Sequence, residues 1–214
     1  MFLKFPYLHL PLIMRENIIQ KAAEMFLNLG FKSVTMDDLA NEMGISKKTI
    51  YSYFKNKNEL VAQTTMSMSE FITCGINDII SLEKNPIEEL YEIKKFVMVH
   101  MKDEKSSPLY QLQKYYPKIF KSLMEIQFEC TNKCVSENVK RGINTGIYRD
   151  NLNVEFVSRI YFSGVMAIKN NKLFPTDIFS QPQLLDNYLE YHLRGIVTPK
   201  GRKILNSIIN SNQE

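Results

Sequence analysis

Residues 35–60 read TMDDLANEMGISKKTIYSYFKNKNEL and set the architecture of the chain. Thr35 and, three residues later, Asp38 have the spacing of a capping box, in which two side chains satisfy free backbone amides at the start of a helix. Apolar residues then recur at helical spacing until Gly44, which suits the left-handed residue that ends a short helix. Ser46 can cap a second helix. The pattern therefore predicts two short helices joined by a tight corner.

The second helix is expected over 47–54, with Ile50, Tyr53 and Phe54 on its inner face. Two helices that cross at a wide angle need a small residue at their contact, here Ala40, and a glycine at the corner. The outer face carries side chains of the kinds that contact phosphates and base edges. These outer residues are Lys47, Lys48, Thr49, Tyr51 and Ser52.

The charge around the corner favours the same function. Residues 44–58 contain four lysines and no acid, so the local field attracts a polyanion. The pattern predicts a DNA-binding helix-turn-helix. The alternative is an ordinary helical corner with a solvated basic face, in a helical protein-interaction module that binds no specific DNA.

Residues 35–60 strongly resemble the TetR/AcrR family of bacterial transcriptional regulators. The most specific part is IYSYFKNKNEL, residues 50–60. It is similar to the family signature of tyrosine, any residue, tyrosine or histidine, phenylalanine, two residues, lysine, any residue, glutamate and leucine. The resemblance extends back through AAEMF, residues 22–26, and covers about residues 15–62. It implies an all-α protein with an N-terminal three-helix DNA-binding domain and a larger C-terminal helical domain for ligand binding and dimerisation.

The resemblance also implies which residues contact DNA. The start of the first motif helix lies where the family contacts backbone phosphate, and the first residues of the second helix enter the major groove. Tyr51 and Lys57 are expected to bind phosphates. Lys48 stands where many family members carry glycine, which adds positive charge and leaves the detailed base contacts open. The expected DNA-binding residues are Thr35, Met36, Ser46, Lys47, Lys48, Thr49, Tyr51, Ser52 and Lys57.

Composition favours the same fold and places limits on other functions. The chain has 214 residues, a net charge of +4, and only eight glycines and eight prolines. Helix formers fill the long windows between the prolines, which favours an all-α fold. Three cysteines, an odd number, argue against a disulfide framework and for a reducing cytosol. No apolar run reaches the roughly 18–20 residues of a membrane span, so we expect a cytoplasmic protein.

Three segments are expected along the chain. Residues 1–13 are apolar, but two prolines, a histidine and the missing small-residue cleavage site argue against a signal peptide. They should be either an extra arm or a sign that the biological start is Met14. Residues 14–57 should form the DNA-binding domain, and residues 58–214 the ligand-binding and dimerisation domain. The helices expected outside the motif cover about 15–29, 57–82, 86–105, 109–114, 117–144, 154–172, 183–196 and 200–209.

The larger domain is rich in large, adaptable side chains. Aromatic and methionine residues on several helices predict an apolar pocket for a small apolar or amphipathic effector. The alternative is a plain helical core, and His100 in particular can be a partly buried core residue rather than a ligand contact. The expected pocket residues are Phe71, Phe96, His100, Tyr110, Tyr115, Met124, Phe128, Phe162 and Met166.

The resemblance implies a homodimer. Two recognition helices must reach successive major grooves about 34–36 Å apart on a palindromic operator. A ligand that prefers another separation of these helices would weaken DNA binding, and repression is the family default. The expected interface lies on the helices over 154–172 and 183–196, through Ile160, Val165, Leu184, Leu185, Tyr188 and Leu189.

The sequence offers little for catalysis. The three histidines lie far apart, no Cys/His spacing fits zinc, and no phosphate loop or nucleophile elbow is present. We therefore expect no enzyme, no metal and no cofactor. Cys130 and Cys134 lie four apart on one helix face, where a redox switch is conceivable, but this geometry suits a disulfide poorly and favours inert thiols. Glu88, Glu89 and Glu92 are expected on a solvated helix face.

Overall fold

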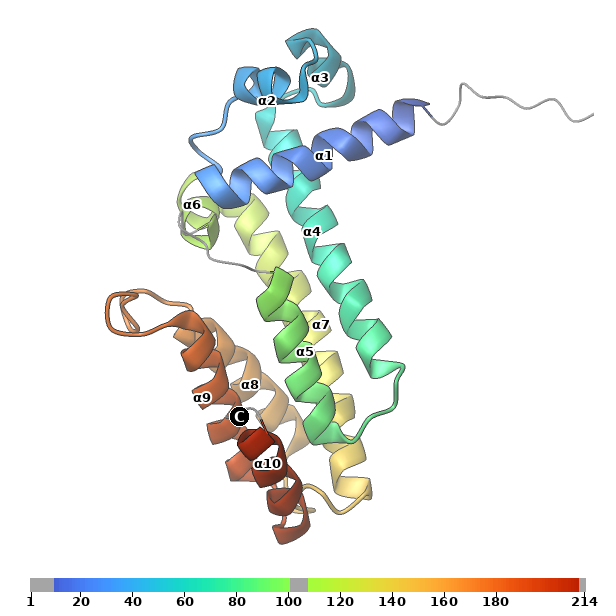
Figure 1. Cartoon of the computed structure of the whole chain (residues 1–214), viewed down its shortest axis with the longest axis vertical. Helices are drawn as coiled ribbons and strands as arrows, with labels where there is room; N and C mark the ends of the chain where they lie inside the picture. The colour runs from blue at the N-terminus through green and yellow to red at the C-terminus, as the bar shows by residue number, and fades with distance from the viewer. Residues whose placement is uncertain (1–9, 101–107, 212–214) are drawn as a thin grey trace, which may run out of the picture. The chain divides into compact units, whose positions relative to one another are not determined.

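The computed structural model describes residues 10–100 and 108–211. Within them the chain forms ten α-helices and no β-strand, and one isolated antiparallel bridge joins Tyr148 to Val197. The all-α prediction is therefore confirmed (Figure 1). The helices are α1 (Leu10–Leu29), α2 (Met36–Met43), α3 (Lys47–Tyr53), α4 (Lys57–Ile80), α5 (Pro86–His100), α6 (Pro108–Tyr115), α7 (Pro117–Asn144), α8 (Val154–Ile168), α9 (Gln181–Ile196) and α10 (Pro199–Ser211).

Most helices lie close to their predicted ranges, and the long helix expected over 117–144 is α7. α1, however, begins at Leu10 rather than at Arg15. Pro11 lies in its first turn, where a proline has no intrahelical hydrogen bond to lose. Residues 10–13 of the expected arm are therefore helical, and residues 1–9 lie outside the described part of the chain.

α8 ends at Ile168, four residues before the predicted end at Lys172. The side chain of Asn170 accepts a hydrogen bond from the Lys172 amide at 2.9 Å, and its carbonyl oxygen accepts one from the Leu173 amide at 2.9 Å. Asparagine stabilises turns in this way because its short side chain competes with the helical backbone. A local turn thus ends the helix that periodicity alone would extend.

The described residues form two compact units. Unit 1 comprises residues 10–72 and 108–125, and unit 2 comprises residues 73–100 and 126–211. α4 and α7 each contribute residues to both units. Each unit has its own cluster of buried apolar side chains.

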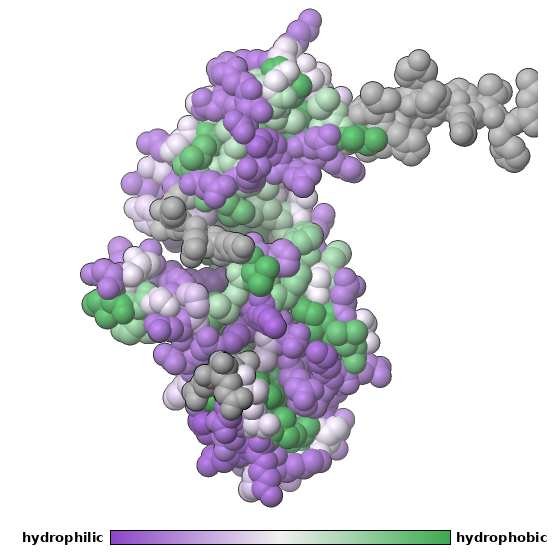
Figure 2. All heavy atoms as spheres, viewed as in Figure 1, coloured by the Kyte–Doolittle hydropathy of each residue, from purple (hydrophilic) through white to green (hydrophobic). Residues whose placement is uncertain are grey.

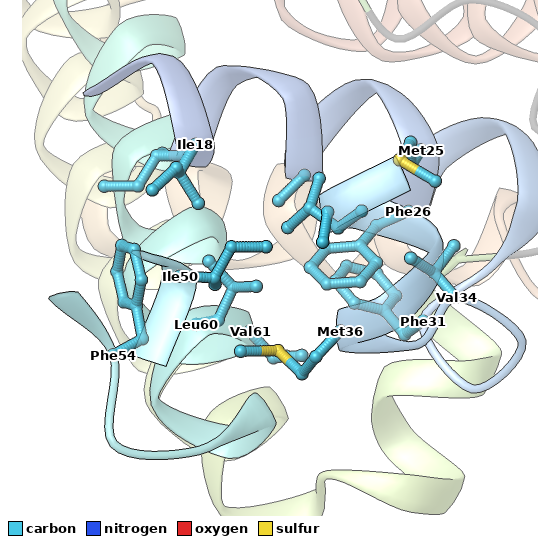
Figure 3. Close-up of a cluster of buried hydrophobic side chains, with 14 of the residues drawn as sticks. Ile18, Met25, Phe26, Phe31, Val34, Met36, Ile50, Phe54, Leu60 and Val61 are labelled. Carbon is cyan, nitrogen blue, oxygen red and sulfur yellow. The ribbon is translucent and has the colours of Figure 1, made fainter. Parts of the chain in front are cut away.

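The core of unit 1 brings the helix-turn-helix and its supporting helices together (Figure 3). Ile18 of α1, Leu39 of α2 and Ile50 of α3 are each 0% exposed. Full burial of such a side chain contributes roughly 1.5–3 kcal/mol. Leu112 of α6 and Leu123 of α7 belong to the same cluster, so the compact unit extends well beyond the segment predicted to bind DNA.

Unit 2 contains a buried polar network around Glu89, which is 1% exposed. Asn138 Nδ2 donates to Glu89 Oε1 at 2.8 Å, and Arg141 forms an ion pair with the other carboxylate oxygen. Asn138 Nδ2 also donates to the Pro86 carbonyl oxygen at 2.9 Å, and the Tyr148 hydroxyl donates to Asn138 Oδ1 at 3.0 Å. A buried carboxylate is tolerated only with such partners, so the network fixes α5 against α7.

The expectation of a solvated acidic face is wrong for Glu89. Glu88 is exposed and Glu92 half-buried, whereas the Glu89 side chain points into unit 2. Its partner Asn138 lies 49 residues further along the chain. A run of acids on one predicted helix gives no sign of so distant a partner.

Two glycines of unit 2 allow tyrosine rings to approach the helix backbone closely. A Cβ on Gly142 would lie 2.0 Å from the ring of Tyr148, and a Cβ on Gly164 would lie 2.2 Å from the ring of Tyr188. The Tyr188 hydroxyl donates to the carbonyl oxygen of Tyr161 at 3.0 Å. The approach of Tyr188 to Gly164 fixes the register of α9 against α8, whereas the approach of Tyr148 to Gly142 holds the residues after α7 against that helix.

His192 of α9 is buried in an apolar and aromatic environment. It is 7% exposed, its ring lies edge-on to that of Tyr161 at 5.0 Å between centroids, and its Nε2 has no hydrogen-bond partner among the described residues. Burial lowers the pKa of His192 from 6.5 to about 4, because protonation would place an unpaired charge inside the unit.

This burial predicts an acid sensitivity of the fold. Below pH 6.5 the unfolded chain protonates His192 while the native protein does not, so the free energy of unfolding should fall as the pH drops from about 6.5 to about 4. The full effect is about 3 kcal/mol. Urea unfolding at a series of pH values should show that His192→Phe loses this part of the pH dependence. The carboxylates titrate in both proteins, so parallel pH profiles for wild type and variant would contradict the assignment.

Candidate nucleic-acid interface

Local hydrogen bonds fix both ends of α2. The Thr35 hydroxyl accepts from the Asp38 amide at 3.1 Å and the Thr35 amide donates to the Asp38 carboxylate at 2.8 Å, which confirms the predicted capping box. The Thr35 amide and the Thr35 hydroxyl both donate to the Asp38 carboxylate, and these two bonds lower the pKa of Asp38. At the other end Gly44 has φ 65°, and the Ile45 amide donates to the Ala40 carbonyl oxygen at 3.0 Å. The predicted left-handed glycine is confirmed, and the chain turns directly into α3.

α3 is capped at its start and anchored on its inner face. The Ser46 hydroxyl accepts from the Thr49 amide at 3.0 Å, as expected of an N-cap. Ile50 and Phe54 are 0% exposed, whereas Tyr53 is half-buried. The exposed outer residues are Lys47, Lys48, Tyr51 and Ser52. On the visible face in Figure 2, hydrophilic residues cover much of the surface over α2, and the surface over α3 is mixed.

α2 carries three acids, which would repel DNA phosphates if they were uncompensated. Lys47 Nζ lies 2.6 Å from a carboxylate oxygen of Asp37, and Lys21 Nζ lies 3.0 Å from one of Glu42. The third acid, Asp38, caps the helix. The hydrogen bond to Asp37 raises the pKa of Lys47. Asp37 is thus paired with a lysine of α3 and Glu42 with a lysine of α1, and Lys47 is held toward α2.

Two other lysines predicted to bind DNA, Lys48 and Lys57, have different surroundings. Lys48 is exposed and forms no ion pair with any residue in the described ranges. Lys57 Nζ instead donates to the backbone carbonyl oxygen of Lys32 at 3.1 Å. Burial lowers the pKa of Lys57, while the nearby charge of Asp38 acts in the opposite direction. Lys48 can therefore turn its whole ammonium group to a phosphate, whereas Lys57 also supports the turn before α2.

Residues 18–64, which contain this motif, match the family described as bacterial regulatory proteins, tetR family. The chain belongs to the TetR family. The transcriptional repressor KstR2 of Mycolicibacterium smegmatis is 22% identical over 202 residues, which cover 90% of this chain and 95% of that protein.

Two solved structures share the fold with this TetR-family chain. A TetR-family transcriptional regulator of Mesorhizobium loti aligns with a TM-score of 0.68 at 18% identity, over 88% of this chain and 99% of that one. A transcriptional regulator of Saccharomonospora viridis in complex with choline aligns with a TM-score of 0.73 at 14% identity, over 87% and 98% of the two chains. As a member of the TetR family, the protein is a DNA-binding transcriptional regulator.

Four of the predicted effector-pocket residues lie in unit 1. Phe71, Tyr110 and Tyr115 are 55%, 57% and 38% exposed. Met124 packs against the apolar core around Phe26 instead. A pocket that includes these four residues remains a prediction.

The other predicted pocket residues lie in unit 2, where they form two aromatic pairs. Phe96 and His100 have ring centroids 4.3 Å apart, and His100 Nδ1 lies 2.9 Å from the Phe96 carbonyl oxygen. Phe128 and Phe162 meet edge to face at 5.3 Å. Met166 is half-buried. The pairs give unit 2 adaptable apolar surface, and their role in a pocket also remains a prediction.

The residues predicted for a TetR-type dimer interface differ in exposure. Ile160 of α8 is 47% exposed, whereas Leu184 and Leu189 of α9 are 6% and 2% exposed and face the interior of their own unit. Val165, Leu185 and Tyr188 are half-buried. Leu184 and Leu189 therefore offer almost no surface to a second chain, because these apolar side chains of α9 are buried within their own unit.

Sequence reasoning missed a residue that supports the motif from α6. Gln111 Oε1 accepts a hydrogen bond from the Lys32 amide at 3.1 Å. Its side chain occupies the space beside Gly30, where an added Cβ would lie 2.3 Å from Gln111 Nε2. Gly30 also has φ +90°, so this site needs glycine for two reasons. The glycine was a visible signal of a close approach, but its partner lies 79 residues from Lys32.

Residues 10–100 and 108–211 match neither the pattern of a metal site nor that of a membrane-spanning helix. There, no three His, Cys, Asp or Glu side chains group as metal ligands would, and no helix has the length and apolar character to cross a membrane. Cys74 and Cys130 are exposed thiols. Burial, aided by the charge of Glu89, raises the pKa of Cys134 to about 12, which disfavours the thiolate that redox chemistry needs.

The corner at Gly44 predicts a specific pattern of stability changes. An added Cβ there meets nothing within 4 Å, so Gly44→Ala tests the backbone alone. It should cost about 1 kcal/mol of unfolding free energy, because alanine is strained at positive φ. Gly195 of α9 also has open space but an ordinary φ, so Gly195→Ala should stabilise by roughly 0.5–1 kcal/mol. Urea unfolding measures both, and the same sign for the two variants would refute the corner's backbone requirement.

Proposed function

We propose that the protein is a repressor that binds a palindromic operator as a homodimer in the bacterial cytoplasm and leaves it when a small apolar or amphipathic effector binds. The observation that carries the proposal is the orientation of α3. Its apolar residues Ile50 and Phe54 are completely buried, and its outer face offers lysine, tyrosine and serine side chains to solvent.

The outer face of α3 fits the chemistry of a DNA groove. Lysine binds phosphates and the guanine acceptor atoms, and hydroxyl groups donate to phosphates and bases. Thr49 Oγ1 is hydrogen-bonded to Ser46 at 2.8 Å, so its methyl group is the part left for contact with a base. Lys48 and Tyr51 are exposed, so the Lys48 ammonium group and the Tyr51 hydroxyl can reach the DNA. Repression is supported by the resemblance to the repressor KstR2.

A homodimer is supported by exposed apolar side chains on the two helices predicted to form the interface. Phe156 and Ile160 lie one turn apart on α8 and are 63% and 47% exposed. Tyr191 of α9 is 78% exposed. Such side chains on packed helices favour burial against a second copy. Two copies would bring two α3 helices to one palindrome.

The effector's chemistry is proposed from the aromatic side chains of unit 2. The ring of Phe96 lies against Gly75, where a Cβ would be 2.1 Å from it, and the Phe128 and Phe162 rings form an edge-to-face pair. Rings of this kind accommodate an apolar ligand. α4 follows the motif in sequence and contributes residues to both units. A ligand that displaces the second half of α4 would therefore also act on its first half, next to the motif in sequence. The shift in DNA affinity is limited by the ligand's preference between the two states.

In vitro selection of DNA fragments by the ligand-free protein tests DNA reading. We expect an enriched palindrome whose half-sites lie about one helical turn apart. Lys48→Ala should weaken binding and lower the slope of log affinity against log salt by about one. Lys118→Ala, which removes an exposed lysine of α7, is the matched control and should change neither. A folded dimer that enriches no sequence would favour the protein-interaction module instead.

Charged substitutions on α8 test the dimer. Phe156→Glu combined with Ile160→Glu should give monomers in sedimentation or light scattering, because carboxylates would have to be desolvated in the interface. Leu82→Glu is the matched control, since Leu82 is a 62% exposed apolar residue between α4 and α5. A dimer that survives the double substitution would move the interface to another surface.

A further inference from the structure

A cluster of lysine and tyrosine side chains lies where α6 meets the turn between α1 and α2 in unit 1. Lys32 Nζ lies 4.6 Å from the centroid of the Tyr115 ring, and Lys114 Nζ lies 5.4 Å from the same centroid. Lys114 Nζ is also 5.7 Å from the centroid of the Tyr110 ring. Two ammonium groups from distant parts of the sequence thus converge on one phenol.

The charge of this cluster is uncompensated within the described residues. Lys21 and Lys47 of the same unit each pair with carboxylates, whereas no described acid forms an ion pair with Lys32 or Lys114. Two cations held on one side chain repel each other, and an anion between them would remove that repulsion.

The phenol of Tyr115 reports the positive potential of the cluster. Partial burial acts to raise the pKa of Tyr115, but the ammonium groups of Lys114 and Lys32 outweigh it, and the pKa lies below its ordinary value. A site that favours the anionic form of its own oxygen also favours an anionic oxygen brought by a ligand.

The backbone of this cluster is held in place from two sides. Gln111 Oε1 of α6 accepts from the Lys32 amide at 3.1 Å, and Lys57 Nζ of α4 donates to the Lys32 carbonyl oxygen at 3.1 Å. Lys32 is therefore fixed to the helix that carries Lys114 and Tyr115. Its position does not depend on the long lysine side chain alone.

We propose that Lys32, Lys114, Tyr110 and Tyr115 form a binding site for the phosphate or carboxylate group of a small molecule. Each lysine supplies ammonium donors and each tyrosine supplies a hydroxyl donor. A DNA backbone needs a row of cations along its path, whereas these two ammonium groups converge on a single ring, which suits one compact anionic group. The proposal goes beyond the effector contact proposed for unit 2.

An occupied site would also act on the motif. Lys32 lies three residues before the cap Thr35, and its carbonyl oxygen binds Lys57 at the start of α4. An anion that draws Lys32 and Lys114 together would stabilise this turn against α6. This consequence for operator binding rests on the proposed function, whereas the site itself does not.

Inorganic phosphate is the probe for the site. The thermal unfolding midpoint of the DNA-free protein should rise with phosphate at fixed ionic strength, relative to chloride. Lys32→Met and Lys114→Met keep the apolar stem of each lysine and should each raise the apparent Kd for phosphate roughly tenfold. Lys118→Met removes an exposed lysine from the same unit and should leave the Kd unchanged. Acetate in place of phosphate tests the carboxylate alternative with the same variants.

Three outcomes would overturn the site. Equal phosphate response in wild type and both variants would place the anion elsewhere, for example on the lysines of α3. If phosphate does not change the unfolding midpoint of the wild type, the proposed site is wrong. Loss of DNA affinity in both variants, without any phosphate effect, would reassign these lysines to the DNA backbone. Because the titration contains no DNA, a failed operator selection beside a positive phosphate result would overturn the proposed function and leave the site intact.

Discussion

Gly44 holds a left-handed backbone, φ 65°, between α2 and α3, and the direction of α3 follows from it. The caps on either side act on the same corner, since Thr35 and Asp38 begin α2 and Ser46 begins α3. Ile50 is completely buried beneath the corner, so α3 cannot rotate about its axis without exposing it. Local backbone chemistry and this burial thus determine which face of α3 points outward.

The features that could be predicted from sequence are those that depend on near neighbours in the chain. The capping box, the corner glycine and the Ser46 cap each involve residues only a few positions apart, and all are confirmed. Asn153 caps α8 through an equally local hydrogen bond, from the Phe156 amide at 3.0 Å. The start of α1 and the end of α8 were missed, because one proline and one asparagine act on single turns that a periodic pattern passes over.

The features that could not be predicted depend on distant partners. The sequence gives no sign that Glu89 is buried, since Asn138 and Arg141 reach it from another helix. Apolar periodicity likewise identified a face of α9 but could not tell whether it covers its own unit or a second copy, and Leu189 covers its own. For the same reason the DNA-facing residues could be named from the motif, whereas the bond that ties Lys47 to Asp37 could not.

Unit 1 is discontinuous in sequence, and this has a consequence for biosynthesis. Its core includes Leu112 and Leu123, while residues 73–100 between the motif and these leucines belong to unit 2. A ribosome delivers the chain from its N-terminus, so the motif emerges well before the residues that complete its apolar support. The DNA-reading part can reach its final packing only once the first turns of α7 have been made. The motif therefore cannot be moved to another protein with its packing intact. Residues 14–57 alone would lack part of the apolar core on which the motif rests.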